Sequence, residues 1–177
     1  MREQLKTMSE EQRAAGSQRA RTLLASQSKW AVAHSVLFFA PLPEELDVWP
    51  MLEDALGAGK VVALPRFVAE TGNYVACAIE DLAKDLNTGQ FGIREPADRC
   101  SEIALNRLDL ALVPGVAFDL QGRRLGRGRG FYDRMLETMR GTTCGVAFDE
   151  QIVRDVPVEP LDVSVNCILT PTRWIEL

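Results

Sequence analysis

Four short runs of apolar residues constrain the fold of this chain more than any other feature. They cover residues 35–40, 61–65, 108–113 and 144–148. Apolar runs of this length are typical of strands that are buried on both faces, as in a parallel sheet covered by helices. The alternation over 74–79 predicts one further strand, whereas 87–93 has the composition of a loop.

Segments with helical character separate several of these runs. Residues 2–28 are predicted to be largely helical, and Ser9-Glu10-Glu11-Gln12 matches a capping box at which a second helical segment begins. Asp47 is the expected N-cap of a helix that ends at 57–59, and a third helix is expected over 131–140, stopped by Gly141. Two strand–helix–strand units follow, which predict an α/β fold: a single three-layer α/β/α domain over 1–177 with a mostly parallel sheet.

Composition narrows the class of protein. The chain is 46% hydrophobic and 25% charged, with a net charge of −5, so its overall field repels nucleic acid and anionic membranes. No leader or membrane span is evident. Four scattered cysteines and one histidine, His34, favour buried thiols over a zinc site or a disulfide framework. We therefore expect a cytoplasmic monomer that binds neither nucleic acid nor membrane.

Positive charge is concentrated in one segment. Between Arg123 and Arg134 there are five arginines and one aspartate, a local charge of +4 (five minus one) in a chain of −5. Glycines at 126, 128 and 130 alternate with arginines, which lets backbone N–H groups approach an anion. Arginine forks suit phosphate oxygens, and the expected helix would begin at this loop, beyond the carboxyl end of a buried strand. The segment therefore predicts a phosphate site.

Known phosphate-binding motifs do not explain this loop. It lacks the Gly-Lys-Ser/Thr ending of Walker A, and its Gly-x-Gly-x-Gly spacing differs from the dinucleotide fingerprint. The alternative is a solvated arginine hairpin that touches RNA. Asp133, on the first turn of the expected helix, fits either a Mg²⁺ ligand beside bound phosphates or a salt-bridge partner of the arginines.

The loop and the residues before it resemble the 5-formyltetrahydrofolate cyclo-ligase family, also called methenyltetrahydrofolate synthetase. The match runs over 113–119, continues at Gly122 and covers 124–133, where Phe131 stands in place of the family's first tyrosine. Weaker matches lie at 43–47 and 63–66, which resemble the turn after the family's first strand and the end of its second. Residues 91–96 resemble the family's folate-side loop, and 156–159 precede its late acidic motif at Asp162. The resemblance implies the three-layer fold that ribose-5-phosphate isomerase and CoA transferases share.

The implied reaction is the ATP-dependent conversion of 5-formyltetrahydrofolate, with or without a polyglutamate tail, to 5,10-methenyltetrahydrofolate, with release of ADP and phosphate. ATP phosphorylates the formyl oxygen, and N10 of the folate then attacks the activated carbon. Such a reaction asks for charge neutralisation and alignment rather than for a protein nucleophile.

The same resemblance implies roles for individual residues. Those expected to bind ATP are Arg124, Leu125, Gly126, Arg127, Gly128, Arg129, Gly130, Phe131 and Tyr132. Arg127, Arg129 and Tyr132 are expected to take part in catalysis, and Asp133 and Asp162 to hold Mg²⁺. Those expected to contact the folate are Ala40, Glu45, Phe91 and Phe131. Without the family, Glu45 and Asp162 fit ordinary turn carboxylates equally well.

Three departures from the family pattern stand out. A Lys-x-x-x-Arg pair of the family's first helix would fall ahead of Met1, and Arg2 and Lys6 have its spacing but the wrong register. Leu161 replaces a frequent histidine, and Asn166 replaces an aspartate. The alternative function is a non-catalytic relative that binds nucleotide, folate or RNA through the same loop.

Overall fold

A mixed eight-stranded sheet forms the centre of the computed structural model, which describes residues 5, 7–89, 92–128, 130–157 and 159–177. The strand order is β12-β11-β10-β7-β1-β2-β3-β6. Its strands are β1 (Ser35–Leu37), β2 (Val61–Val68), β3 (Asn73–Ile79), β6 (Glu102–Ile103), β7 (Leu110–Pro114), β10 (Thr142–Val146), β11 (Cys167–Leu169) and β12 (Trp174–Glu176). The interior from β11 to β2 is parallel, and the strands at both edges are antiparallel, so the predicted mostly parallel sheet is confirmed.

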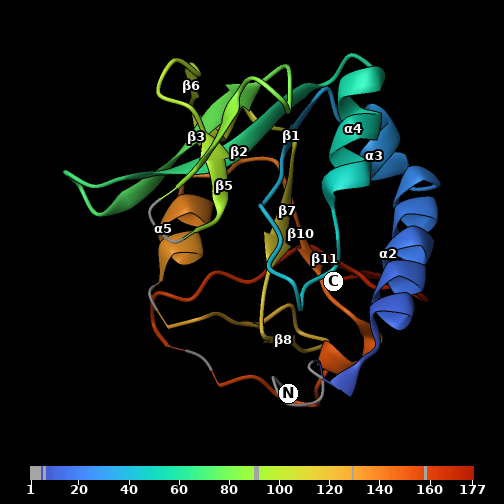
Figure 1. Cartoon of the computed structure of the whole chain (residues 1–177). Helices are drawn as coiled ribbons and strands as arrows, with labels where there is room; N and C mark the ends of the chain where they lie inside the picture. Colours follow the sequence, from blue (N-terminus) through green and yellow to red (C-terminus); the bar gives the residue numbers. More distant parts are fainter. Residues whose placement is uncertain (1–4, 6, 90–91, 129, 158) are drawn as a thin grey trace.

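Helices cover both faces of this sheet. Figure 1 shows α2 (Glu10–Ala25), α3 (Ser28–Val32) and α4 (Trp49–Gly57) together on one side and α5 (Phe131–Glu137) on the other. One apolar cluster includes Leu24 of α2 and Leu52 of α4, and a second includes Leu136 of α5. The three-layer α/β/α prediction is therefore confirmed. Among the described residues, no helix is both long and apolar enough to span a bilayer.

The predicted helix boundaries are partly correct. The Ser9–Gln12 capping box is present and begins α2, and α4 ends at Gly57. Asp47 is not the N-cap of α4, because Val48 occupies that position. The Asp47 carboxylate instead accepts a hydrogen bond from the N–H of Trp49 at 3.0 Å, a local turn that brings the chain into the helix one residue later.

Two boundaries near the glycine-rich loop were also misplaced. α5 ends at Glu137 rather than at residue 140, since the chain must turn to pass Gly141 close against the backbone of Leu108. An ideal Cβ on Gly141 would lie 2.2 Å from the Leu108 carbonyl oxygen. β10 then starts at Thr142, two residues before the predicted strand, because its pairing with β7 runs only from Leu110 to Pro114.

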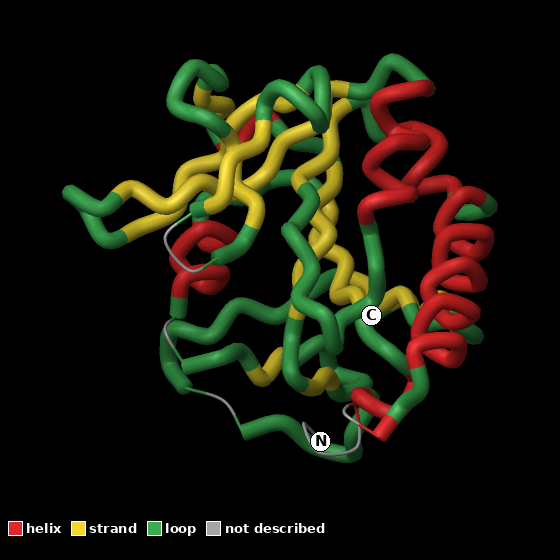
Figure 2. Tube along the Cα trace, in the orientation of Figure 1, coloured by secondary structure: helices red, strands yellow, loops and turns green. Residues whose placement is uncertain are grey.

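The segment predicted as a loop over 87–93 contains part of a small hairpin. β4 (Leu86–Thr88) pairs with β5 (Arg94–Pro96) in an antiparallel two-stranded sheet. A second small pair, β8 (Ala117–Phe118) with β9 (Arg124–Leu125), follows β7. Figure 2 shows that the connections after β7 run mostly as loop beyond one end of the sheet. That end holds the carboxyl termini of the parallel strands, where ligands bind in open α/β sheets.

The four cysteines are confirmed as buried thiols, and none of them forms a disulfide. Burial raises the pKa of the Cys77 thiol to about 11, so this group stays protonated at neutral pH. These residues serve as small apolar side chains of the core.

Candidate functional site

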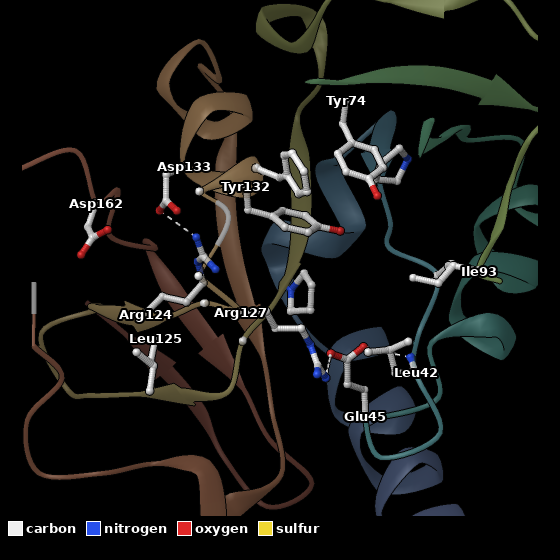
Figure 3. A pocket seen from close by; sticks show the side chains of 18 of the residues that line it. Leu42, Glu45, Tyr74, Ile93, Arg124, Leu125, Arg127, Tyr132, Asp133 and Asp162 are labelled. Carbon is white, nitrogen blue, oxygen red and sulfur yellow. Dashed lines mark hydrogen bonds and ion pairs between the residues drawn. The ribbon is translucent and has the colours of Figure 1, made fainter. Parts of the chain in front are cut away.

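A cavity of about 410 Å³ lies at the carboxyl ends of β1 and β7. Figure 3 shows the glycine-rich loop on one side of it and Leu42, Glu45 and Ile93 on the other. The predicted site residues that line it are Ala40, Glu45, Arg124, Leu125, Gly126, Arg127, Gly128, Gly130, Phe131, Tyr132, Asp133 and Asp162. Phe91 and Arg129 lie outside the described residues, as do Arg2 and Lys6.

The backbone of the loop depends on its glycines. Gly128 has φ +89° and Gly130 has φ +60°, in the left-handed region of backbone conformation that residues with a Cβ rarely adopt. Gly130 is also the N-cap of α5, so the left-handed turn leads directly into Phe131, Tyr132 and Asp133 on the first helical turn. The spacing of the glycines thus sets which side chains face the cavity.

Arg124 and Asp133 form a buried ion pair at one side of the cavity. Their closest nitrogen and oxygen atoms are 2.7 Å apart, and the side chains are 4% and 15% exposed. The same Asp133 oxygen, Oδ1, accepts a hydrogen bond from the N–H of Val163 at 3.3 Å. The salt-bridge interpretation of Asp133 therefore holds in this structure, and the carboxylate also ties the loop to the segment that carries Asp162.

Arg127 extends across the cavity mouth to two glutamates. Its guanidinium lies 2.9 Å from Glu45 and 3.1 Å from Glu44. Glu45 also accepts a hydrogen bond from the N–H of Leu42 at 2.9 Å. Burial raises the pKa of the Glu45 carboxyl above its usual range, while the Leu42 N–H and Arg127 oppose that rise. Glu45 is thus more than an exposed turn residue.

Aromatic side chains form the third wall of the cavity. The rings of Tyr74 on β3 and Phe131 on α5 meet edge to face, with centroids 5.0 Å apart. The Arg124 guanidinium lies 5.8 Å from the centroid of the Tyr132 ring. Burial raises the pKa of the Tyr132 hydroxyl, and the nearby Glu45 adds to that rise, so the phenol is neutral at physiological pH and able to donate a hydrogen bond.

Asp119 does not line the cavity, but its carboxylate holds the backbone that leads into the glycine-rich loop. Its fully buried carboxylate accepts hydrogen bonds from the N–H groups of Gln121, Arg123 and Val156 at 2.9–3.1 Å. Burial alone would raise the pKa of Asp119, but these donors and the Arg123 guanidinium outweigh it and lower the pKa. Because Val156 begins the segment that leads to Asp162, one carboxylate holds both sides of this part of the site.

Replacing Asp119 with asparagine is expected to lower the free energy of unfolding by roughly 3 kcal/mol at pH 7, because an amide cannot accept from every donor that surrounds the site. The lowered pKa means that the Asp119 contribution is present above about pH 4, the usual value for an unfolded aspartate, and is lost as the pH falls below it. Urea unfolding at pH 7 and pH 3 measures both effects.

Asp155→Asn is the matched control, since Asp155 pairs with the same Arg123 but its side chain is 70% exposed. We expect it to change the unfolding free energy by less than about 1 kcal/mol. Equal losses in the two variants would contradict the positioning role of Asp119.

Asn166 and Leu161, two departures from the family pattern, lie in different surroundings. Asn166 lies at the start of β11 and accepts hydrogen bonds from the N–H and hydroxyl of Thr143 at 2.8 and 2.9 Å. It therefore stands at the opposite end of the strands from the cavity and does not line it. Leu161 is 84% exposed beside Asp162.

Other cavity residues were not predicted individually from the sequence. They are Leu42, Pro65, Tyr74, Ile93, Arg94, Glu95, Pro114, Gly115, Pro157 and Glu159. Ile93, Arg94 and Glu95 lie within the 91–96 segment that resembles the family's folate-side loop. Tyr74 gave no signal beyond its place in an alternating strand.

The two sides of the cavity differ in chemistry, and together they define a class of site. One side offers the guanidinium groups of Arg124 and Arg127, which suit phosphates, and the other offers apolar and aromatic surface with carboxylates, which suits a flat heterocycle with N–H donors. A protein with such a cavity can bind a phosphate compound and an organic ring side by side in one pocket.

Comparison with known proteins supplies the family. The sequence profile of the 5-formyltetrahydrofolate cyclo-ligase family matches residues 1–171. The 5-formyltetrahydrofolate cyclo-ligase of Escherichia coli K12 is 32% identical over 98% of this chain and 97% of its own length, and the Mus musculus enzyme is 25% identical over 96% and 89%. The chain therefore belongs to the 5-formyltetrahydrofolate cyclo-ligase family.

Solved structures agree with this assignment. The 5,10-methenyltetrahydrofolate synthetase of Aquifex aeolicus superposes with a TM-score of 0.88 at 30% identity, over 98% of this chain and 87% of that one. The synthetase of Mycoplasma pneumoniae superposes with a TM-score of 0.76 at 19% identity, over 96% and 93%, and supports the fold alone.

Proposed function

We propose that this chain catalyses the ATP-dependent closure of 5-formyltetrahydrofolate to 5,10-methenyltetrahydrofolate, with release of ADP and phosphate. The observation that carries the proposal is the convergence of the glycine- and arginine-rich loop with Ala40 and Glu45 on one cavity. Membership of the cyclo-ligase family supports it. Purified protein with 5-formyltetrahydrofolate, ATP and Mg²⁺ is expected to form the methenyl product, followed by its absorbance, and omission of ATP is expected to stop it.

Different residues of the cavity are expected to act on ATP and on the folate. Arg124 and Arg127, which line the cavity, would neutralise the ATP phosphates as the terminal phosphoryl group moves from ADP to the formyl oxygen. N10 of the folate then forms its bond to the formyl carbon and loses its proton, which the departing phosphate can take, and the carbon–oxygen bond breaks as phosphate leaves with that oxygen. The neutral Tyr132 hydroxyl is a donor for the oxygen on which charge develops.

The residues present fit a Mg²⁺ ion. Hydrogen bonds to Asp133 go to its Oδ1 atom, and the one to Asp162 goes from the N–H of Glu159 to Oδ2 at 2.7 Å. Among the described residues, each carboxylate therefore keeps one oxygen without a hydrogen bond, available to a hard cation that takes one or two carboxylates plus phosphate oxygens. The described residues contain no cluster of three or more such side chains, so ATP itself would complete the site. When bound, Mg²⁺ would neutralise phosphate charge.

Asp162→Asn is expected to raise the Mg²⁺ concentration for half-maximal activity by roughly tenfold, because a neutral amide is a weaker ligand for a hard cation. Asp162 is exposed, so the melting temperature should change little. Activity titrated with Mg²⁺ at saturating ATP measures the effect, and titration of Mg²⁺ into the ATP-bound protein measures binding directly. An unchanged Mg²⁺ requirement would exclude Asp162 as a ligand.

We further propose that the protein acts as a monomer in the cytoplasm, on folates with or without a polyglutamate tail, and without nucleic acid. The buried free thiols are typical of a protein in a reducing compartment. Sedimentation at catalytic concentrations tests the monomer.

A further inference from the structure

A buried glutamine joins two connections of the chain behind the cavity. Gln151, in the short 3-10 helix η2 (Asp149–Gln151), is 2% exposed. Its side-chain N–H₂ group donates to the carbonyls of Gly115 and Val116 at 2.8 and 3.2 Å, and its Oε1 atom accepts from the N–H of Phe148 at 2.8 Å. Both polar atoms of this amide therefore have backbone partners, and the amide ties the connection after β10 to the connection after β7.

The connection after β7 belongs to the phosphate side of the cavity. Gly115 lines the cavity, and the N–H of Val116 donates to the carbonyl of Leu125 at 2.7 Å. Leu125 and Arg124 form β9, which pairs with β8 and leads directly into the glycine-rich loop. Gln151 is therefore joined to the start of that loop through two successive hydrogen bonds.

The Arg124 side chain packs directly on the same connection. An ideal Cβ on Gly115 would lie 3.0 Å from the Cγ atom of Arg124 and 2.7 Å from the buried ring of Phe118. The approach is so close that a displacement of Gly115 would also displace the stem of Arg124. Figure 3 shows the Arg124 guanidinium next to Asp133, at one side of the cavity. The place of this cation thus depends on where the backbone of residues 115–116 lies.

We propose that Gln151 is a positioning residue for the ATP phosphates, because it fixes the backbone of Gly115 and Val116 against which Arg124 packs. This inference rests on the proposed function and adds a residue that does not itself line the cavity. An amide suits the role, since two carbonyls need a donor and one N–H needs an acceptor at the same place. Ala40 and Glu45, which are expected to contact the folate, come from the segment after β1 instead. Loss of the amide should therefore affect ATP more than folate.

Gln151→Met tests the proposal, since it keeps the approximate length and volume of the side chain and removes its donors and its acceptor. We expect the KM for ATP to rise roughly tenfold and kcat to fall roughly 10- to 100-fold, because a small displacement of a charge-stabilising group is costly in phosphoryl transfer. The KM for 5-formyltetrahydrofolate should stay within about twofold of the wild-type value.

Thr143→Val is the matched control for the loss of buried hydrogen bonds. Thr143 is 5% exposed and exchanges hydrogen bonds with Asn166 at the end of the strands opposite the cavity. This variant should also lower the melting temperature, yet it should leave kcat and both KM values unchanged. Each protein is assayed well below its own melting temperature, so that the comparison concerns folded protein.

A second variant and a second measurement keep the proposal testable. Gln151→Asn retains an amide that is one methylene too short to reach Gly115 and Phe148 together, and it should show the same ATP-specific loss if Gln151→Met folds poorly. Calorimetry with ATP and Mg²⁺ in the absence of folate should show binding that is weaker by about tenfold in either variant.

Equal rises in the KM values for ATP and folate, or the same ATP-specific loss in Thr143→Val, would overturn the role of Gln151. So would an unchanged ATP affinity in both Gln151 variants. A wild-type chain that binds ATP but forms no methenyl product contradicts the proposed function instead, and its ATP affinity still tests Gln151.

Discussion

Replacing Arg124 with alanine is expected to destabilise the protein and abolish most of its activity together. The guanidinium is 4% exposed and pairs with Asp133 at 2.7 Å, so its loss leaves a largely buried carboxylate without its cation. Breaking such a pair costs about 3–5 kcal/mol, which corresponds to a fall in melting temperature of roughly 6–20 °C for a chain of this size. Loss of a phosphate donor should also lower kcat/KM for ATP about 100- to 1,000-fold.

A double variant separates the two effects. In Arg124→Ala/Asp133→Ala the unpaired carboxylate is gone, so stability should partly return while activity does not. Arg21→Ala is the surface control. Its guanidinium pairs with Asp54 at 2.6 Å, but the two side chains are 35% and 41% exposed, so its loss should change the melting temperature little. If the double variant recovered activity, Arg124 would not belong to the phosphate site.

Replacing Arg127 with alanine is expected to lower kcat/KM about 100- to 1,000-fold and to move the acidic limb of the pH profile to higher pH. The fall in rate follows from the loss of one positioned donor for the transferring phosphoryl group. The pH shift follows from Glu45, whose pKa burial already raises and Arg127 partly restrains. Without Arg127 the pKa rises further, so ionised Glu45, the form expected to bind folate, disappears at a higher pH than in the wild type.

Measurement of kcat/KM for folate from pH 5 to pH 9 in both proteins checks this shift. Glu44→Gln is the matched control, because Glu44 contacts the same guanidinium at 3.1 Å from a more exposed position. It should leave both the rate and the profile close to those of the wild type. An acidic limb that stays in place in Arg127→Ala would show that Glu45 does not set it.

Much of the fold follows from local sequence signals. The apolar runs locate β1, β2, β7 and β10, because strands buried on both faces contain few polar residues. The errors lie where tertiary contacts decide a boundary: the close passage of Gly141 against Leu108 shortens α5, and the pairing with β7 sets the start of β10. Local pattern carries no information about such contacts.

The site was predictable to the extent that its residues are neighbours in sequence. Gly128, Gly130 and the arginines share one segment, so their common purpose is readable from spacing. Asp119 stands at the end of the 113–119 match, but its role depends on its burial and on Val156, which lies far away along the chain. That role becomes visible only when hydrogen-bond donors and acceptors are matched in three dimensions.

The central claim is that the loop from Arg124 to Asp133 binds ATP for a reaction that consumes 5-formyltetrahydrofolate. It is tested most directly by following ADP and the methenyl product together, in the wild type and in Arg127→Ala/Arg129→Ala. We predict one ADP for each methenyl product in the wild type, and a loss of both in the double variant while its melting temperature stays within a few degrees. Methenyl product formed without ADP, or undiminished turnover in the double variant, would contradict the claim.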